Sequence, residues 1–256
     1  MDDKLLLEAV MLAGEIMLES GSEIYRVEDT MNHMLKKSGY ESRETIAYVT
    51  GVFLTLNDPR REPVTLIKRI SSRSTNIDRI YRVNDISRRF CSGVICASEA
   101  YEELIALKNQ KPQYSKRFKL LGNIGVSAFF APMFGGGMAE FFGAGLVGLA
   151  LAVMSWFTQR IRLNDFCVNA CGAFAVAVSA ILISRLAPWP DEGVMIVSGI
   201  MPLVPGVTFT TSIRDMLNGD YSSGSARIME AIVVALAVAA GAGCGMMLFH
   251  MSGGRI

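Results

Sequence analysis

Long uncharged, mostly apolar stretches fill the second half of the chain. Five of them follow one another without an Asp, Glu, Lys or Arg: 120–139, 141–159, 166–184, 193–213 and 231–254. A helix of about 20 residues spans a hydrocarbon core of about 30 Å, so each stretch is long enough to cross a bilayer. The pattern predicts an α-helical membrane protein with five transmembrane helices.

The first half has the periodicities of a soluble α+β domain. Apolar residues recur at helical spacing over 4–19 and 23–37, and β-rich residues follow at 44–56 and 63–67. This order predicts two helices and then a β-hairpin or part of a small sheet. Asn76 and Ser98 are suitable N-caps for two further helices. We therefore expect a domain at 1–118 and a transmembrane domain at 119–256.

The first helix is expected to be amphipathic, with Glu8, Glu15 and Glu19 directed away from its apolar face. The chain starts Met1-Asp2-Asp3-Lys4, which is acidic where a signal peptide is basic. We therefore expect the first domain to remain in the cytoplasm.

Charge is distributed as two different solvents would require. Residues 1–119 hold 36 of the 49 charged side chains, although the net charge of the whole chain is only +1. That balance gives no sign of a nucleic-acid partner. Nine basic residues adjoin the spans on one face of the membrane, and two adjoin them on the other. The nine are Lys108, Lys111, Lys116, Arg117, Lys119, Arg160, Arg162, Arg214 and Arg227. The two are Arg185 and Arg255. The positive-inside rule then predicts that residues 1–119 lie in the cytoplasm and the carboxyl terminus lies outside. We therefore expect a multi-pass protein of the cell (inner or plasma) membrane.

The fourth apolar stretch contains a helix breaker, Met201-Pro202-Leu203-Val204-Pro205-Gly206. Pro202 and Pro205 remove two N–H donors, and Gly206 permits unusual backbone angles. Interrupted helices often build the substrate or ion site of secondary transporters. A kink needed only for packing is an equal alternative. A re-entrant segment is a further alternative, and it would return the carboxyl terminus to the cytoplasm.

Polar residues at and after this break form the candidate transport site. The arginines are suited to bind a carboxylate, and the acidic residues to exchange protons or hold the arginines in place. The same charges have a purely structural explanation. They would cap helices, mark the membrane topology and pair with one another, Arg214 with Asp215 or Asp220. The candidate substrate-binding and transport residues are Pro202, Pro205, Gly206, Thr208, Thr211, Arg214, Asp215, Asp220, Arg227 and Glu230.

Several other functions lack their sequence signatures. The chain has no P-loop, no dinucleotide-binding fingerprint and no zinc-protease or nucleophile-elbow motif, which leaves no route to ATP use. Its five cysteines form no CxxC pair, and His33 and His250 are isolated. An intramembrane enzyme would need paired acidic or nucleophilic groups at depth. We therefore expect no catalytic residues, no metal and no cofactor.

In several motifs along its length the chain resembles the threonine/serine exporter family. The resemblance covers nearly the whole chain, and its motifs occur in the family's order: 21–28, 76–79, 134–137, 202–206 and 214–227. Full-length members resemble two five-span halves fused together. This chain is similar to the larger subunit of the split, two-gene type, for which succinate export is implied.

The resemblance implies a subunit of an ion-driven secondary exporter for small carboxylate-bearing metabolites, either threonine and serine or a succinate-like dicarboxylate. Its partner would be a small five-span-type membrane subunit supplying the missing half. Faces rich in Gly and Ala bring helices together within one subunit or between two subunits. A homo-oligomer in the lipid bilayer is therefore a further alternative. The alternative function is a membrane-anchored sensor or regulator that binds a small molecule in its cytoplasmic domain.

Overall fold

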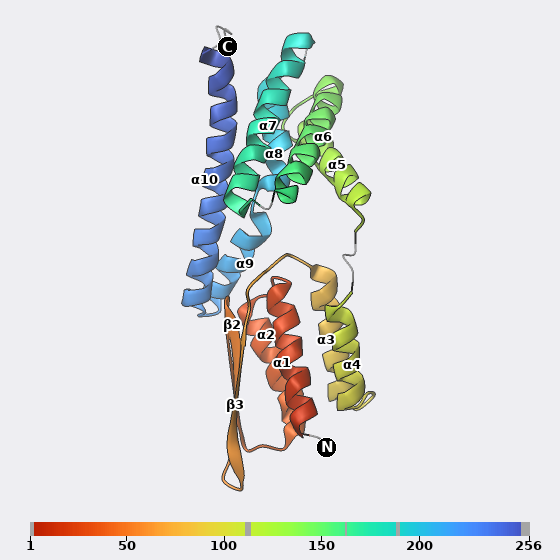
Figure 1. The fold of residues 1–256 in the computed structure, drawn as a ribbon, viewed down its shortest axis with the longest axis vertical. Helices are drawn as coiled ribbons and strands as arrows, with labels where there is room; N and C mark the ends of the chain where they lie inside the picture. Colours follow the sequence, from red (N-terminus) through yellow and green to blue (C-terminus); the bar gives the residue numbers. More distant parts are fainter. Residues whose placement is uncertain (1–2, 111–113, 162, 188–189, 252–256) are drawn as a thin grey trace. The chain divides into compact units, whose positions relative to one another are not determined.

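The computed structural model describes residues 3–110, 114–161, 163–187 and 190–251. The chain is mostly helical and separates into two compact units (Figure 1). Unit 1 comprises Met1–Lys111 and Val207–Met229, and unit 2 comprises Pro112–Gly206 and Glu230–Ile256. Lys111, Arg162 and Arg255, three of the basic residues used to predict orientation, lie outside the described residues.

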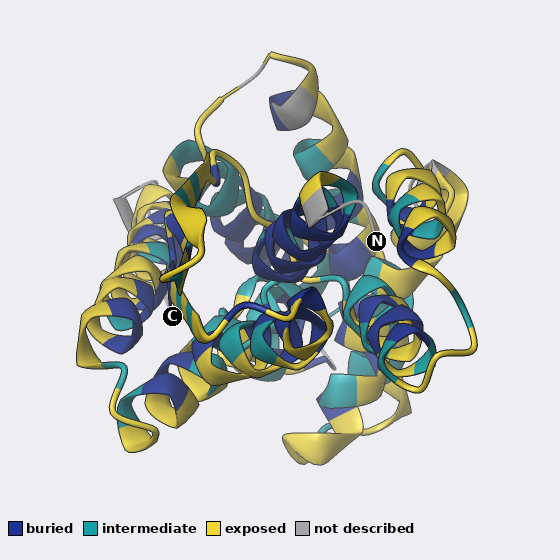
Figure 2. Cartoon of the chain, turned by 90° about the horizontal axis from the view of Figure 1, so that it is seen from below, coloured by how far each residue is buried: buried dark blue, intermediate teal, exposed yellow. Residues whose placement is uncertain are grey.

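Unit 1 surrounds its first helix with the other elements. These are α1 (Asp3–Glu19), α2 (Ile24–Leu35), η1 (Lys36–Ser38), β1 (Ser42–Tyr48), β2 (Gly51–Asp58), β3 (Arg61–Arg69), α3 (Ile77–Cys91) and α4 (Ala97–Lys108). Helix α1 packs against α2, α3, α4 and β2. It is therefore the centre of the core, and most of its residues are dark blue, for buried, in Figure 2.

The expected amphipathic character of α1 is wrong for Glu15. This residue is buried, and its carboxylate lies 3.3 Å from Lys68 Nζ on β3 and 2.6 Å from Lys108 Nζ on α4. Helix α1 has neighbours on several sides, so a charged position on it needs partners from other elements instead of water.

The sheet has three antiparallel strands in the order β1-β2-β3. The β-rich run at 44–56 is divided by a turn, because Tyr48 pairs with Gly51 and leaves Val49 and Thr50 as the loop. Along β2, Val52, Leu54 and Leu56 are fully buried in alternation with more exposed residues. This period of two directs one face of the sheet into the core of unit 1.

Unit 2 is a bundle of apolar helices. It contains α5 (Lys116–Met133), α6 (Met138–Arg160), α7 (Asp165–Leu186), α8 (Glu192–Ile200) and η2 (Met201–Leu203), together with the greater part of α10 (Tyr221–Met251). Gly241 on α10 meets α7 so closely that a Cβ would lie 2.0 Å from the Ala170 carbonyl oxygen. Small residues are thus required where these two helices cross.

Three described helices are long and apolar enough to cross a membrane: Met138–Thr158, Asp165–Leu186 and Tyr221–Phe249. At most 39% of any of these apolar segments is buried inside the chain, as expected for surfaces that face lipid. The bent pair of α8–η2 and α9 (Gly206–Leu217) would raise the number to four. The sequence predicted five, and the difference is α5, whose 18 residues begin with the basic residues Lys116, Arg117 and Lys119.

The expected interruption of the fourth stretch is present. Helix α8 ends at Ile200, η2 ends at Leu203, and Val204 has extended backbone angles (φ −67°, ψ 125°). Pro205 then precedes α9, whose first residue is Gly206. Gly206 is helical and does not use the backbone freedom that glycine permits. Pro202, Val204 and Pro205 make the break.

Candidate functional site

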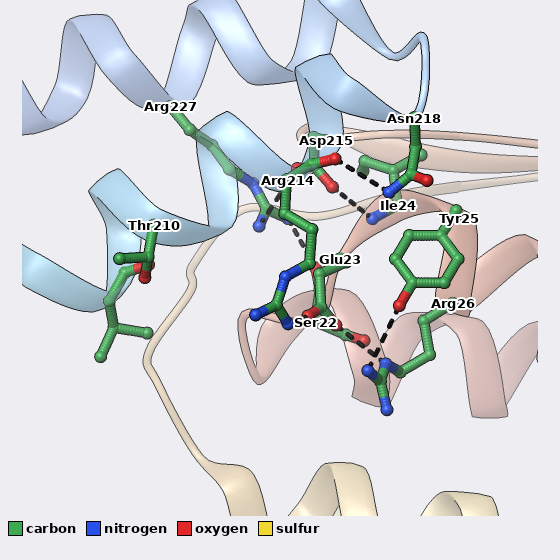
Figure 3. A network of polar contacts seen from close by, with 11 residues as sticks. Ser22, Glu23, Ile24, Tyr25, Arg26, Thr210, Arg214, Asp215, Asn218 and Arg227 are labelled. Carbon is green, nitrogen blue, oxygen red and sulfur yellow. Dashed lines mark hydrogen bonds and ion pairs between the residues drawn. The ribbon is translucent and has the colours of Figure 1, made fainter.

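A network of polar residues inside unit 1 joins α9 and the start of α10 to the beginning of α2. Figure 3 shows Arg214 and Asp215 from α9 and Arg227 from α10 directed toward Ser22, Glu23 and Ile24. All six belong to unit 1, although about 190 residues of sequence separate the two groups. The first turns of α2 therefore anchor the segment that follows the helix break.

The N-terminus of α2 receives its cap from this distant segment. Ser20, Gly21 and Ser22 form the turn from α1, where Gly21 has a φ of 81° that favours glycine. The side chain of the N-cap residue, Glu23, accepts no capping hydrogen bond from the backbone N–H groups of the helix. Instead, the Ile24 N–H donates to Asp215 Oδ1 over 3.0 Å. A carboxylate at this place satisfies a free N–H group and is stabilised by the helix dipole.

Asp215 and Arg227 form a buried ion pair. Asp215 is 0% exposed and Arg227 is 4% exposed. Arg227 Nη1 lies 3.4 Å from Asp215 Oδ2, and Arg227 Nη2 donates to the Ser22 carbonyl oxygen over 2.7 Å. Removing one member of such a pair leaves an uncompensated charge without water, so the two residues depend on each other.

Glu23 forms a second set of charged contacts, with two arginines that lie nearer the surface. Its carboxylate bonds Arg214 and, over 2.8 Å, Arg26 Nε. Burial raises the pKa of Glu23, but its hydrogen bonds with its own N–H, Arg214 and Arg26, together with the charge of Arg26, outweigh burial and leave the pKa below its ordinary value. Arg214 is 58% exposed in its side chain, so this contact is far more accessible than the Asp215–Arg227 pair.

The turn between α9 and α10 brings a further carboxylate close to α2. Gly219 has a φ of 96°, and the Asp220 N–H donates to the Asp215 carbonyl oxygen over 3.0 Å. Burial raises the pKa of Asp220. Burial also raises the pKa of Glu28 on α2; a hydrogen bond from the Ala47 N–H opposes this, and the charge of Asp220 adds to it. Glu28 and Asp220 thus repel each other when both are ionised.

Four of the ten candidate residues meet in this network: Arg214, Asp215, Asp220 and Arg227. Thr208 and Thr211 lie on α9 and are half-buried in unit 1. The remaining four belong to unit 2: Pro202 lies in η2, Pro205 directly precedes α9, Gly206 is the first residue of α9, and Glu230 is exposed on α10. The described residues contain no group of three or more His, Cys, Asp or Glu side chains suited to hold a metal ion.

The residues that sequence reasoning missed are Ser22, Glu23, Ile24 and Glu28. They lie in the motif at 21–28, whose only sequence-level signal is its resemblance to a family. Ile24 takes part through its backbone N–H, which has no side-chain signature. Glu23 was not recognisable as the partner of Arg214, because many acidic residues in the chain are equally suitable by type.

Comparisons with known proteins agree over almost the full chain. The family model ThrE, described as "Putative threonine/serine exporter", matches residues 8–249. The "Probable threonine/serine exporter" of Mycobacterium tuberculosis is 23% identical over 245 residues, covering 92% of this chain and 45% of the relative. The "Threonine/serine exporter" of Corynebacterium glutamicum is 24% identical over 243 residues, covering 92% of this chain and 49% of the relative.

The chain thus spans about half the length of these curated relatives. No solved structure gives a significant match. The family match extends from α1 to α10 and includes both the helix break and the polar network. On this ground the chain belongs to the threonine/serine exporter family.

Proposed function

We propose that the chain is a subunit of a secondary membrane exporter for small carboxylate-bearing metabolites, either threonine and serine or a succinate-like dicarboxylate. An ion gradient drives the export, and a second membrane subunit supplies what the relatives carry in the rest of their length. The support is family membership, together with three or four helices suited to cross a membrane.

The observation that carries the proposal is the position of the helix break. The break at Pro202 and Pro205 leads directly into α9, and α9 carries Arg214 and the buried Asp215. An interrupted helix leaves backbone groups that need a polar surrounding, which a substrate pathway provides. Guanidinium groups just beyond the break are suited to a carboxylate substrate.

Five crossings follow if α5 and the bent pair both span the membrane, with residues 1–118 in the cytoplasm. In the described structure Arg214 and Arg227 are bonded to Glu23, Asp215 and Ser22. A substrate carboxylate that contacts these arginines therefore competes with groups of the protein itself.

Reconstituted vesicles test this function. Labelled serine, threonine and succinate would be followed in vesicles that hold the chain with and without the second subunit, under an imposed proton or sodium gradient. We expect gradient-dependent flux of at least one of the three, reduced by a Pro202→Ala, Pro205→Ala double variant. Pro132→Ala is the matched control, because Pro132 lies within the last turn of α5 and is not part of the break at 202–205. Absence of flux under every gradient would end the proposal.

The alternative function is a membrane-anchored sensor, and one observation favours it. Unit 1 has a surface groove of about 390 Å³ between α3 and α4, with Arg82, Arg89 and Gln110 among its lining. Both arginines already pair with carboxylates, Arg82 with Asp78 and Arg89 with Asp85 and Glu103. Ligand binding to unit 1 without any flux, abolished by Arg82→Gln, would support the sensor over the exporter.

A further inference from the structure

The N-terminus of α2 already holds a carboxylate, and that carboxylate comes from the chain itself. Helix N-termini bind anions through free N–H groups and the positive end of the helix dipole. Helix α2 has 12 residues, and its Ile24 N–H bonds Asp215 Oδ1 at 3.0 Å. Arg227 adds a full positive charge beside the second carboxylate oxygen. The place therefore has the chemistry of a carboxylate-binding site.

A second, independent observation is that polar atoms at this place lack hydrogen-bond partners. Asp215 Oδ2 is buried and accepts no hydrogen bond, and its 3.4 Å separation from Arg227 Nη1 is longer than a charged hydrogen bond. The hydroxyls of Ser20 and Ser22, residues that are each 1% exposed, are likewise buried without a partner among the described residues. Buried polar groups without partners are rare and need an explanation. The unpartnered Asp215 Oδ2 shows that Asp215 is incompletely bonded at this place, and the two serine hydroxyls are donors that it does not use.

We propose that the N-terminus of α2 is an exchangeable carboxylate site, occupied in this conformation by Asp215 and open to a small external carboxylate. The external group takes the Ile24 N–H and the Arg227 guanidinium, and the Ser22 hydroxyl offers it a further donor. Ligand and Asp215 compete for one place, because the Ile24 N–H donates to a single acceptor at a time.

The exchange has a mechanical consequence for α9. Asp215 is the residue of α9 that enters the N-terminus of α2, so its displacement frees this part of α9 from α2. A ligand shifts such an equilibrium only by its difference in affinity for the two states. The carboxylate binds the released state and leaves the Asp215-bound state empty of ligand, which satisfies that condition. The proposal rests on the proposed function only for the identity of the natural carboxylate.

Carboxylate rescue of the purified full chain tests the site. Asp215→Ala vacates the place, and acetate or succinate should then raise the Tm by about 2–4 °C at roughly five times its Kd. Asp191→Ala is the matched control. Asp191 also caps a helix, α8, through the Gly193 and Val194 N–H groups, but these bonds are exposed to water. A rise of the same size with chloride or sulfate, or in Asp191→Ala, would overturn the proposal.

A milder variant guards against a folding failure of Asp215→Ala. Asp215→Asn keeps the oxygen that accepts from Ile24 but loses the negative charge that competes with the ligand. We expect acetate and succinate to bind this variant with a Kd about tenfold lower than the wild type, because the competing state is weakened. An unchanged Kd would overturn the proposal. In the wild type, saturating succinate should speed amide hydrogen exchange in 207–217, and slower exchange there would count against it.

These measurements need no transport. Carboxylate binding at this site without flux in vesicles would leave the site intact and remove the exporter. Flux of carboxylates with no effect of Asp215→Asn on binding would leave the exporter intact and remove the site.

Discussion

At the scale of single residues, unit 1 contains two kinds of charged contact with very different energetic weight. Arg227 and Asp215 are buried and share their surroundings with the α2 N-terminus. Arg214 meets Glu23 with more than half of its side chain exposed. Water can replace the second contact but not the first, so only the buried pair is expected to decide whether α9 stays on α2.

Removing Arg227 should therefore cost much more than removing Arg214. We expect Arg227→Ala to lower the free energy of unfolding by about 3–5 kcal/mol, because it leaves the Asp215 charge buried alone. Arg214→Ala should cost at most about 1 kcal/mol. Denaturant unfolding in detergent, followed by circular dichroism, measures both. Equal costs for the two variants would contradict the assignment.

Glu28 should make unit 1 sensitive to pH. The folded-state pKa of Glu28 lies above its ordinary value through burial and the charge of Asp220. The native state therefore holds the proton more tightly than the unfolded state, and this contribution to stability is present at low pH and lost as pH rises through the raised pKa. Glu28→Gln keeps an oxygen for the Ala47 N–H and removes the charge, so it should be more stable than wild type at pH 7.

The measurement is the difference in stability between Glu28→Gln and wild type from pH 4 to pH 8. We expect this difference to grow as pH rises. Glu102→Gln, on an exposed position of α4, controls for the change of net charge. A difference that shrinks with rising pH would show that Glu28 is stabilised as an anion.

At the scale of elements, α10 has two helical faces with different tolerance for side chains. Gly241 faces α7, where a Cβ would meet the Ala170 carbonyl oxygen at 2.0 Å. Gly243 is two residues away on the same helix and would meet nothing within 4 Å. A backbone atom cannot move aside as a flexible side chain does. The position of Gly241 therefore excludes a larger residue, and the position of Gly243 does not.

The pair provides a controlled test of helix packing. Gly241→Ala should destabilise the protein by roughly 1–3 kcal/mol, because α7 and α10 must separate to admit the methyl group. Gly243→Ala should leave stability within about 0.5 kcal/mol of wild type. Thermal unfolding in detergent measures both changes. Similar effects at the two positions would show that α10 does not pack on α7 as described.

At the scale of the whole molecule, the two units suit different solvents. Unit 1 has a closed apolar core around α1, whereas large apolar side chains such as Phe142, Leu182 and Leu236 are exposed in unit 2. Exposed apolar surface of this extent indicates burial in lipid. The segment 207–229 belongs to unit 1 although it adjoins apolar helices on both sides along the chain.

Membrane orientation can be tested with a membrane-impermeant maleimide. In a variant whose only cysteine is Cys96, an exposed residue of unit 1, intact cells should give no labelling until they are permeabilised. A second variant with Leu186→Cys as its only cysteine should be labelled from outside, since Leu186 is 87% exposed beside the connection that the basic residues place outside. The reverse pattern would invert the proposed orientation.

The local features of the chain can be derived from its amino-acid sequence. Composition, periodicity and backbone chemistry are sufficient to find the apolar stretches, the break at Pro202–Gly206 and the N-cap at Asn76. They also identify Arg214, Asp215, Asp220 and Arg227 as candidate residues. Each of these features depends on neighbours within a few residues of sequence, and such effects act in the same way in every fold.

The choice of which groups meet depends on tertiary packing. Helix α1 has an amphipathic sequence, yet it lies at the centre of unit 1, where Glu15 depends on lysines from β3 and α4. Asp215 caps a helix whose first residue lies 191 positions earlier in the chain. Its partner is a backbone N–H group, which every residue except proline has, so the residue type does not identify the contact. Charges and free N–H groups have many chemically equivalent partners along a chain, and only the packing of the apolar elements selects among them.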